Sequence, residues 1–368
     1  MVTLPIQFGP DANADDAEAW DLFGDGPEPY NTKSGFGMVG TDFVIFADLT
    51  DRLAYVAEVN FQVERTTRNA IEVDVERMFI NYVLNDQVEL QVGQFFTHVG
   101  YWNRNLYARA WLKYSAHVDD VTEEELNYMP THSTGILLHG RIPASNTLDL
   151  NWGLGLANGR NRTPTENIFE RDFNNFPQIT MLLEFVPRVL REARIGLSGW
   201  IDQIQTADLT NVPFGQVVTV GRDTAAQSDV ELLEAGFNPY IVLQGDRASL
   251  LAEYWLIVQS DTNGRLDDES FTSHLALIEV AVHFFDGQLH PYARFDLIKL
   301  PDEGGPYFPL RGDGETEFFR VFVPQGDTLA FGLAYDVAVS SRLKLEYTRF
   351  LEGPRQQNGL VAQLAFGF

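Results

Sequence analysis

The stretch Leu53-Ala54-Tyr55-Val56-Ala57-Glu58-Val59-Asn60-Phe61-Gln62-Val63-Glu64 decides the fold, because its side chains alternate with a period of two. Successive side chains of a β-strand point to opposite faces of the sheet. One face here is apolar and consists of Leu53, Tyr55, Ala57, Val59, Phe61 and Val63. The other face carries Glu58, Asn60, Gln62 and Glu64. The pattern predicts a strand that separates an apolar from a polar environment.

The same alternation recurs along the chain, for example at 148–156 and 178–185. It predicts sixteen strands, at 2–8, 36–49, 53–64, 71–84, 88–96, 132–142, 147–157, 177–186, 193–204, 230–244, 247–259, 271–285, 289–299, 327–339, 342–350 and 359–368. The apolar positions change parity between Val75 and Met78, which predicts a β-bulge in that strand.

Short and long connections alternate along the whole chain. Tight turns follow the even-numbered strands, at 50–52, 85–87, 143–146, 187–192, 245–246, 286–288 and 340–341. Mostly longer loops follow the odd-numbered strands, at 9–35, 65–70, 97–131, 158–176, 205–229, 260–270, 300–326 and 351–358. This layout is typical of a transmembrane antiparallel up-and-down β-barrel, with short periplasmic turns and long extracellular loops. We therefore expect one all-β barrel domain over residues 1–368, because a soluble sandwich does not sort its loops in this way.

The size of the barrel indicates which face meets lipid. About eight strands can be filled by side chains, whereas sixteen leave an aqueous lumen. The polar face is therefore expected inside and the apolar face outside. Aromatic residues on apolar faces near the short turns fit an interfacial girdle: Tyr55, Tyr82, Phe185, Phe284, Phe366 and Phe368. The alternative is that they belong to the core of a large soluble acidic β-protein.

Composition narrows the functional classes. The 368 residues include 52 acids and 26 Lys or Arg, which gives a formal net charge of −26 and argues against nucleic acid as a partner. Cysteine is absent, which removes disulfides, thiolate catalysis and Cys-zinc sites. The first residues lack the basic and apolar regions of a signal peptide. The chain is thus expected to be either cytosolic or the mature form of an exported protein.

The last strand, Leu360-Val361-Ala362-Gln363-Leu364-Ala365-Phe366-Gly367-Phe368, alternates and ends on an aromatic residue. It resembles the closing strand of Gram-negative outer-membrane barrels. This resemblance implies that Phe366 and Phe368 form an assembly signal read by the barrel-assembly machinery. It also places the mature chain in the cell outer membrane.

A second resemblance covers about residues 40–115. It consists of Asp51-Arg52-Leu53, Ala57-Glu58-Val59, Val75-Glu76-Arg77-Met78-Phe79-Ile80-Asn81-Tyr82, Gln91-Val92-Gly93-Gln94-Phe95-Phe96-Thr97 and Gly100-Tyr101-Trp102-Asn103. Ala252-Glu253-Tyr254 and Pro291-Tyr292-Ala293-Arg294-Phe295-Asp296 continue it. Together they are similar to the phosphate-selective porin O/P family and its uncharacterised relatives. The resemblance implies a homotrimeric sixteen-stranded porin in contact with outer-membrane lipid and lipopolysaccharide. That family's ladder of Arg and Lys in the lumen is missing here, which puts phosphate selectivity in doubt.

Charged residues at the alternating positions that form the polar face of each strand are assigned to the lumen wall; we call this assignment polar-face parity. The acids are Glu58, Glu64, Asp149, Glu184, Asp202, Glu234, Glu253, Glu279, Asp296 and Glu346. The bases are Arg77 (beside the bulge), Arg141, Arg194, Arg294 and Lys344. An acidic wall concentrates cations over about a Debye length, roughly 8 Å at physiological salt. Pairing between neighbouring strands is the alternative, and it would still leave acids in excess.

The third long loop, 97–131, is the longest of the long loops. The porin resemblance implies that it folds inward and narrows the channel. Its first half is rich in bases and large aromatic residues: Tyr101, Trp102, Arg104, Arg109, Trp111 and Lys113. Two interpretations stay open. The bases line a cationic constriction, or they pair with wall acids such as Glu58 or Glu76 and only pin the loop.

Chemical signatures are otherwise sparse. The seven His form no HExxH pattern, and GxSxG, phosphate-cradling and dinucleotide motifs are missing, so neither enzymatic activity nor a cofactor is expected. The acidic loop 9–35 offers carboxylates for Ca²⁺, but without EF-hand spacing solvated acidity is the simpler interpretation, and we assign no metal ligands.

These observations favour a water-filled porin for passive diffusion of small hydrophilic solutes or ions, with a weak cation preference. One alternative is an anion- or phosphate-selective porin with a cationic constriction. A second is a structural or interaction barrel whose loops plug the lumen and bind a surface partner.

Overall fold

A computed structural model describes residues 2–8, 35–36, 40–64, 70–107, 109–116, 128–159, 176–190, 193–206, 230–263, 270–301, 327–351 and 358–367. Nearly all of these residues belong to one antiparallel sheet. Its strands are β1 (Val2–Phe8), β2 (Gly35–Phe36), β3 (Gly40–Thr50), β4 (Leu53–Glu64), β5 (Ala70–Asn85), β6 (Val88–Phe96), β7 (His132–Pro143), β8 (Leu148–Ala157), β9 (Gln178–Pro187), β10 (Ala193–Thr206), β11 (Val230–Gln244), β12 (Ala248–Asp261), β13 (Ser270–Val282), β14 (Leu289–Lys299), β15 (Thr328–Ala338), β16 (Ser341–Phe350) and β17 (Asn358–Phe366). A short helix, α1 (Tyr101–Asn105), lies between β6 and β7.

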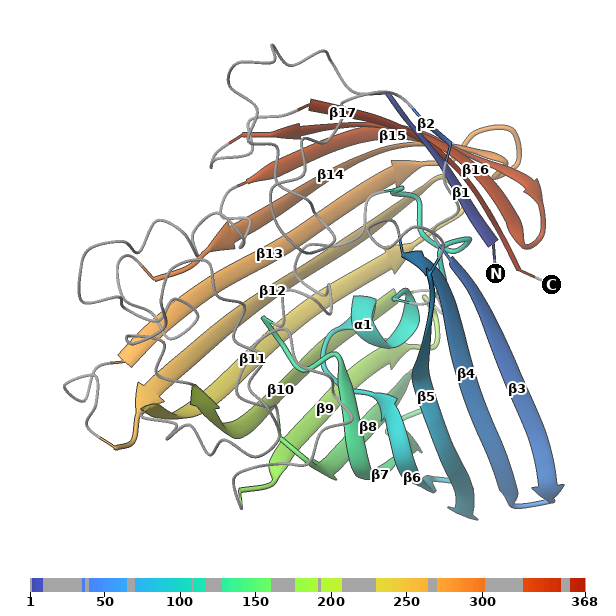
Figure 1. Cartoon of the computed structure of the whole chain (residues 1–368). Helices are drawn as coiled ribbons and strands as arrows, with labels where there is room; N and C mark the ends of the chain where they lie inside the picture. The colour runs from blue at the N-terminus through green and yellow to red at the C-terminus, as the bar shows by residue number, and fades with distance from the viewer. Residues whose placement is uncertain are drawn as a thin grey trace, which may run out of the picture.

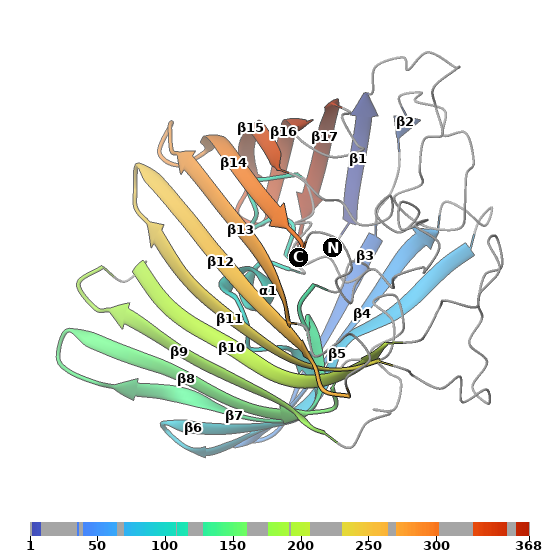
Figure 2. The ribbon, with the colours of Figure 1, turned by 90° about the vertical axis from the view of Figure 1, so that its left-hand side faces the viewer.

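The sheet curls into a barrel wall (Figure 1). From β3 to β17 each strand pairs with the next strand along the chain, which is the up-and-down topology expected from the loop pattern. β1 pairs antiparallel with β17, from Val2 opposite Phe366 to Phe8 opposite Leu360. The first strand thus extends the wall beyond the last one toward β3 (Figure 2). The expected all-β barrel of about sixteen strands is confirmed.

Two details of the strands differ from or refine the sequence prediction. The expected bulge in β5 lies at Glu76, because Glu58 is opposite Arg77 while Val59 is opposite Val75. The strand predicted to reach residue 285 ends at Val282. The chain turns there because Phe285 and Asp286 both take the left-handed conformation, each with a φ of 55°.

The two faces of the barrel wall differ as the alternation predicts. On β9 the outward residues Ile179, Met181 and Phe185 are exposed, and the inward residues Thr180 and Glu184 are buried. None of the helices among the described residues is long and apolar enough to cross a membrane.

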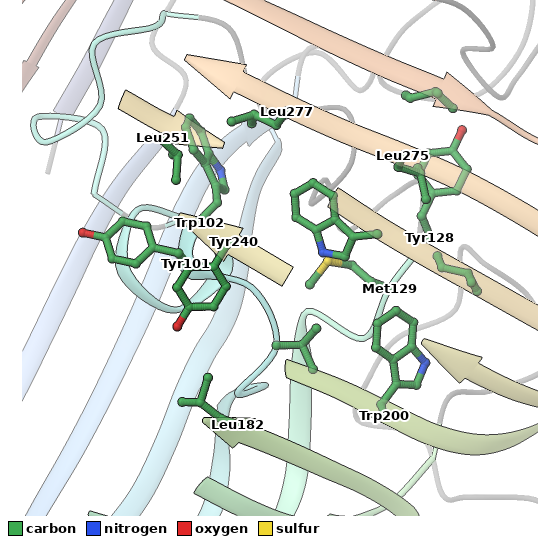
Figure 3. Packing of buried hydrophobic residues seen from close by; sticks show 14 of the residues in the cluster. Tyr101, Trp102, Tyr128, Met129, Leu182, Trp200, Tyr240, Leu251, Leu275 and Leu277 are labelled. Carbon is green, nitrogen blue, oxygen red and sulfur yellow. The ribbon is translucent and has the colours of Figure 1, made fainter. Parts of the chain in front are cut away.

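The interior is less polar than expected. Val99, Trp102 and Met129 of the third loop pack against Trp200 and Trp255 of the wall, and all five are almost fully buried (Figure 3). The sequence predicts a polar lumen on the assumption that water alone fills the barrel. Where α1 and the ends of the third loop cover the wall, inward apolar side chains are shielded from water, so burying them is favourable.

Candidate functional site: the third loop inside the barrel

The N-terminus of α1 is attached to the inner wall by Glu253 of β12. Glu253 accepts hydrogen bonds from the backbone N–H of Tyr101 at 3.0 Å and of Trp102 at 2.5 Å. The N–H of Gly100 donates to Ser198 Oγ at 2.9 Å. The first N–H groups of a helix have no partner within it, and these wall oxygens satisfy them. Gly100 has a φ of 72°, which a residue with a side chain rarely adopts.

Asn103 joins the two ends of the third loop. Its side-chain amide donates to the carbonyl oxygens of Thr97 at 3.0 Å and Thr131 at 2.9 Å. The backbone N–H of Thr97 also donates to the Thr131 carbonyl, at 2.9 Å. Asn103 is fully buried. Both ends of the loop are therefore held at one position on the inner wall.

Arg104 is paired with a carboxylate of the wall. Its guanidinium lies 3.2 Å from Glu184 Oε2 on β9 and donates to Tyr240 Oη on β11 at 2.6 Å. Tyr240 in turn donates to Glu184 at 2.7 Å, and Arg194 binds the second carboxylate oxygen at 2.9 Å. Arg104 thus shares this carboxylate with Arg194, and it is not an isolated cation.

The segment 111–116 is attached to a different part of the wall. Arg342 of β16 donates to the carbonyl oxygens of Leu112 at 2.9 Å and Lys113 at 3.2 Å. Lys344 donates to the Ser115 carbonyl at 2.7 Å, and the Ala116 N–H donates to Glu346 at 2.9 Å. The third loop therefore extends from β9–β12, where α1 is held, to β16.

Trp102 connects these two attachments. The Lys113 ammonium lies 5.3 Å from the centroid of the Trp102 ring, and the Arg294 guanidinium lies 4.6 Å from it. Both distances are within cation–π range. Arg294 also binds Asp296 at 2.9 Å and donates to Ser115 Oγ at 3.0 Å. Trp102 is thus enclosed by charged groups from the loop and from β14.

The remaining loop residues of interest lie at the edges of this arrangement. Tyr101 is buried beside Tyr240, with ring centroids 6.0 Å apart. Arg109 is half-buried, and its charge acts on Glu58. Trp111 lies against Gly367, where a Cβ would come 3.2 Å from the indole.

The wall acids that the sequence suggested as partners of the loop bases bind other groups. Glu58 pairs with Arg77 at 2.6 Å, and Glu76 pairs with His132 at 3.1 Å. Arg104 instead reaches Glu184. Strand parity indicates which side chains point inward, but it does not give their position around the barrel.

Most of the wall residues assigned by parity are buried. Among the described side chains these are Glu58, Asp149, Glu184, Asp202, Glu234, Glu253, Glu279, Arg294, Asp296, Lys344 and Glu346. Arg141 remains exposed near the short turns and pairs with Asp149, which also binds Arg188 at 2.6 Å. The side chain of Glu64 and the whole of Phe368 lie outside the described residues, while Phe366 pairs with Val2 and Ser341.

Sequence reasoning missed four residues that bind or support the third loop: His290, Asp336, Arg342 and Tyr240. Asp336 and Arg342 bind each other at 2.5 Å, and Tyr240 binds Arg104. Asp336 and Arg342 have the same parity as the buried Ala334 and Lys344. Both lie inside the strands predicted at 327–339 and 342–350, so polar-face parity could have found them.

Burial also sets the protonation of loop side chains. It raises the pKa of Tyr101 and of Tyr114, so both phenols stay neutral at physiological pH. It lowers the pKa of His98 well below the ordinary value, and the Arg104 charge contributes to the shift. Within the described ranges no group of three or more His, Asp or Glu could hold a metal ion, and loop 9–35 lies outside those ranges except for Gly35.

A cavity of about 280 Å³ lies between α1 and the wall. Its lining includes His98 and Arg104 of the loop and His139 and Arg141 of β7. The cavity is small and polar, and its two arginines already bind Glu184 and Asp149.

No known protein family and no curated protein matches the sequence. Solved structures do match over nearly the whole chain. The trimer form of OmpT, an outer membrane protein of Vibrio cholerae, is 10% identical with a TM-score of 0.58, over 99% of this chain and 96% of that one. The outer membrane channel DcaP of Acinetobacter baumannii is 11% identical with a TM-score of 0.56, over 99% and 94%. The anion-selective porin from Comamonas acidovorans is 10% identical with a TM-score of 0.57, over 100% and 97%. The chain therefore has the fold of the outer-membrane porin barrels.

Proposed function

We propose that this protein is a non-enzymatic outer-membrane porin that passes small hydrophilic solutes or ions by diffusion, with a weak preference for cations. The observation that carries the proposal is a third loop held inside a barrel of porin fold by contacts to β9–β12 and to β16. Such a loop narrows a lumen and determines which solutes pass. Two of the structural neighbours are described as a channel and an anion-selective porin, which supports the general class.

The charge of the narrow region favours cations. Arg104 and Arg194 share the Glu184 carboxylate, and Arg294 pairs with Asp296. Glu234 accepts hydrogen bonds from Trp200 at 2.6 Å and Gln259 at 2.7 Å, and Glu253 accepts from backbone N–H groups. Among the wall residues assigned by parity the acids outnumber the bases, and we infer that this excess acts on ions in the lumen.

The test is a reversal potential in a salt gradient across a planar bilayer. We expect stepwise increases in current as single channels open. The reversal potential should have the sign that a cation preference gives. The two other functions predict other outcomes. Anion preference would support the anion- or phosphate-selective porin that the sequence resembles. Absence of current from folded protein would support a plugged barrel.

A plugged barrel with a structural or interaction role has one specific observation in its favour. Val99, Trp102 and Met129 form a packed core with the wall, and such packing is typical of a permanent plug as well as of a fixed constriction. Conductance separates the two, because a fixed constriction leaves a path for ions.

The proposed assembly follows the porin pattern. Residues 1–368 form one barrel domain with 97–131 as its constriction loop, and the mature chain lies in the outer membrane as a homotrimer. Phe366 and Phe368 present the assembly signal to the barrel-assembly machinery, while lipid and lipopolysaccharide contact the apolar outer face. Chemical cross-linking of the folded protein in detergent tests the trimer.

A further inference from the structure

Two histidines face each other where the third loop meets the short-turn end of the barrel. His283 lies in the turn after β13, and its Nδ1 is 2.7 Å from Nδ1 of His290 on β14. His290 is buried, and its Nε2 lies 3.1 Å from Asp336 Oδ2 on β15. Asp336 also accepts hydrogen bonds from Arg342 at 2.5 and 3.0 Å. A continuous chain of hydrogen bonds therefore joins the histidine pair to Arg342.

The same groups hold the third loop. Arg342 donates to the carbonyl oxygens of Leu112 and Lys113, and its guanidinium lies 4.7 Å from the centroid of the Tyr114 ring. The Tyr114 ring also contacts His290, with centroids 4.9 Å apart, and His283 at 5.7 Å. Residues 112–114 thus rest on the histidine pair and on the arginine that the pair orients.

Only one proton can lie between the two facing Nδ1 atoms of His283 and His290. An imidazole nitrogen either donates or accepts, and a doubly protonated pair would place an N–H on both facing atoms. Two N–H groups cannot share a 2.7 Å contact, because neither has a lone pair to accept the other. The second proton would also add a positive charge beside Arg342. Binding of that proton must separate the rings.

We propose that the His283–His290 pair is a proton-operated latch that holds residues 112–114 against the wall at neutral pH and releases them in acid. This inference goes beyond the proposed function, since it concerns the position of the loop whether or not the barrel conducts.

The charged environment sets the direction of the response. The ionisable groups that contact or act on the pair are Tyr114 from the loop, Asp336 from β15 and Arg342 from β16, and Glu279 from β13 acts on Tyr114. Arg247, in the turn before β12, accepts a backbone hydrogen bond from His283. Burial, His290 and Arg342 lower the pKa of His283, and Asp336 opposes them. The latched state therefore favours the neutral ring. The latch is fully stable above the ordinary pKa of histidine, weakens as the pH falls below it, and is lost as the pH falls through the lowered pKa.

The absence of cysteine makes a site-specific probe straightforward. A nitroxide attached to Leu112→Cys reports the mobility of the segment, because that side chain is 44% exposed while its carbonyl binds Arg342. We expect an immobilised spectrum at about pH 7.5 and a mobile one at about pH 4.5. A second label at Leu156→Cys, on the outer face of β8, should not change.

His283→Gln and His290→Gln identify the groups responsible. Glutamine stays neutral, so each variant should abolish the pH transition at the Leu112 label. His274→Gln is the matched control, since His274 points outward and binds Tyr254 at 2.6 Å; it should retain the transition. The proposal is overturned if the wild-type label does not respond to pH, if the transition survives in His283→Gln, or if the Leu156 label changes with the same midpoint.

Discussion

Arg104 of the third loop and Glu184 of β9 form a partly buried ion pair at 3.2 Å, although 80 residues separate them in the sequence. The pair holds the start of the third loop against the wall, in the region that we propose as the constriction.

Removing the carboxylate should make Arg104 available to anions. Glu184→Gln leaves the guanidinium of Arg104 without its carboxylate partner. We therefore expect the ratio of anion to cation permeability to rise. Two unit charges 4 Å apart in water interact with about 1 kcal/mol. We therefore expect the permeability ratio to change by at most about fivefold. The reversal potential measures it. Asp246→Asn, the same charge change in an exposed turn, should leave the ratio unaltered, and an equal shift there would contradict the prediction.

Removing the loop bases should not reduce cation preference. The Arg104→Ala, Arg109→Ala, Lys113→Ala triple variant loses three positive charges, so the wall acids should act more strongly and the channel should become more cation-preferring. The salt-gradient potential again provides the measurement. A wild-type anion preference that vanishes in the triple variant would show that the loop cations determine the ion selectivity of the constriction.

Trp102 should be essential for holding the loop. Trp102→Ala removes a fully buried ring that contacts both Lys113 and Arg294, at a cost of about 3–5 kcal/mol. We expect a lower temperature for the heat-dependent gel shift and a changed single-channel conductance. Leu112→Ala, at an exposed position of the same loop, should change neither.

Cysteine labels test the orientation of the barrel. Single cysteines in 9–35, 158–176 or 205–229 should react with an impermeant maleimide on intact cells, because the sequence predicts that these long loops are extracellular. Cysteines in the short turns 51–52 and 286–288 should react only after lysis. Labelling of Asp51→Cys on intact cells would contradict this orientation of the barrel.

The C-terminus should affect assembly more than stability. Deleting Phe368 should lower the yield of folded protein in the membrane and leave the melting behaviour of the folded fraction unchanged, because β17 ends at Phe366. Folded yield measured by heat-dependent gel shift decides this, and an unchanged yield would remove the assembly role.

The sequence by itself determined the barrel. Alternation is a local property, so Met181, Leu183 and Phe185 indicate their face without knowledge of any other strand, and the parity change near Glu76 indicates the bulge. Loop lengths then fix the up-and-down order. Only the tertiary structure decided which inward groups meet. The partner of Arg104 is Glu184 instead of Glu58 or Glu76, and Tyr114 meets His290, because these contacts depend on the curvature of the sheet and the path of the third loop across the lumen. Neither is encoded in the periodicity of one strand.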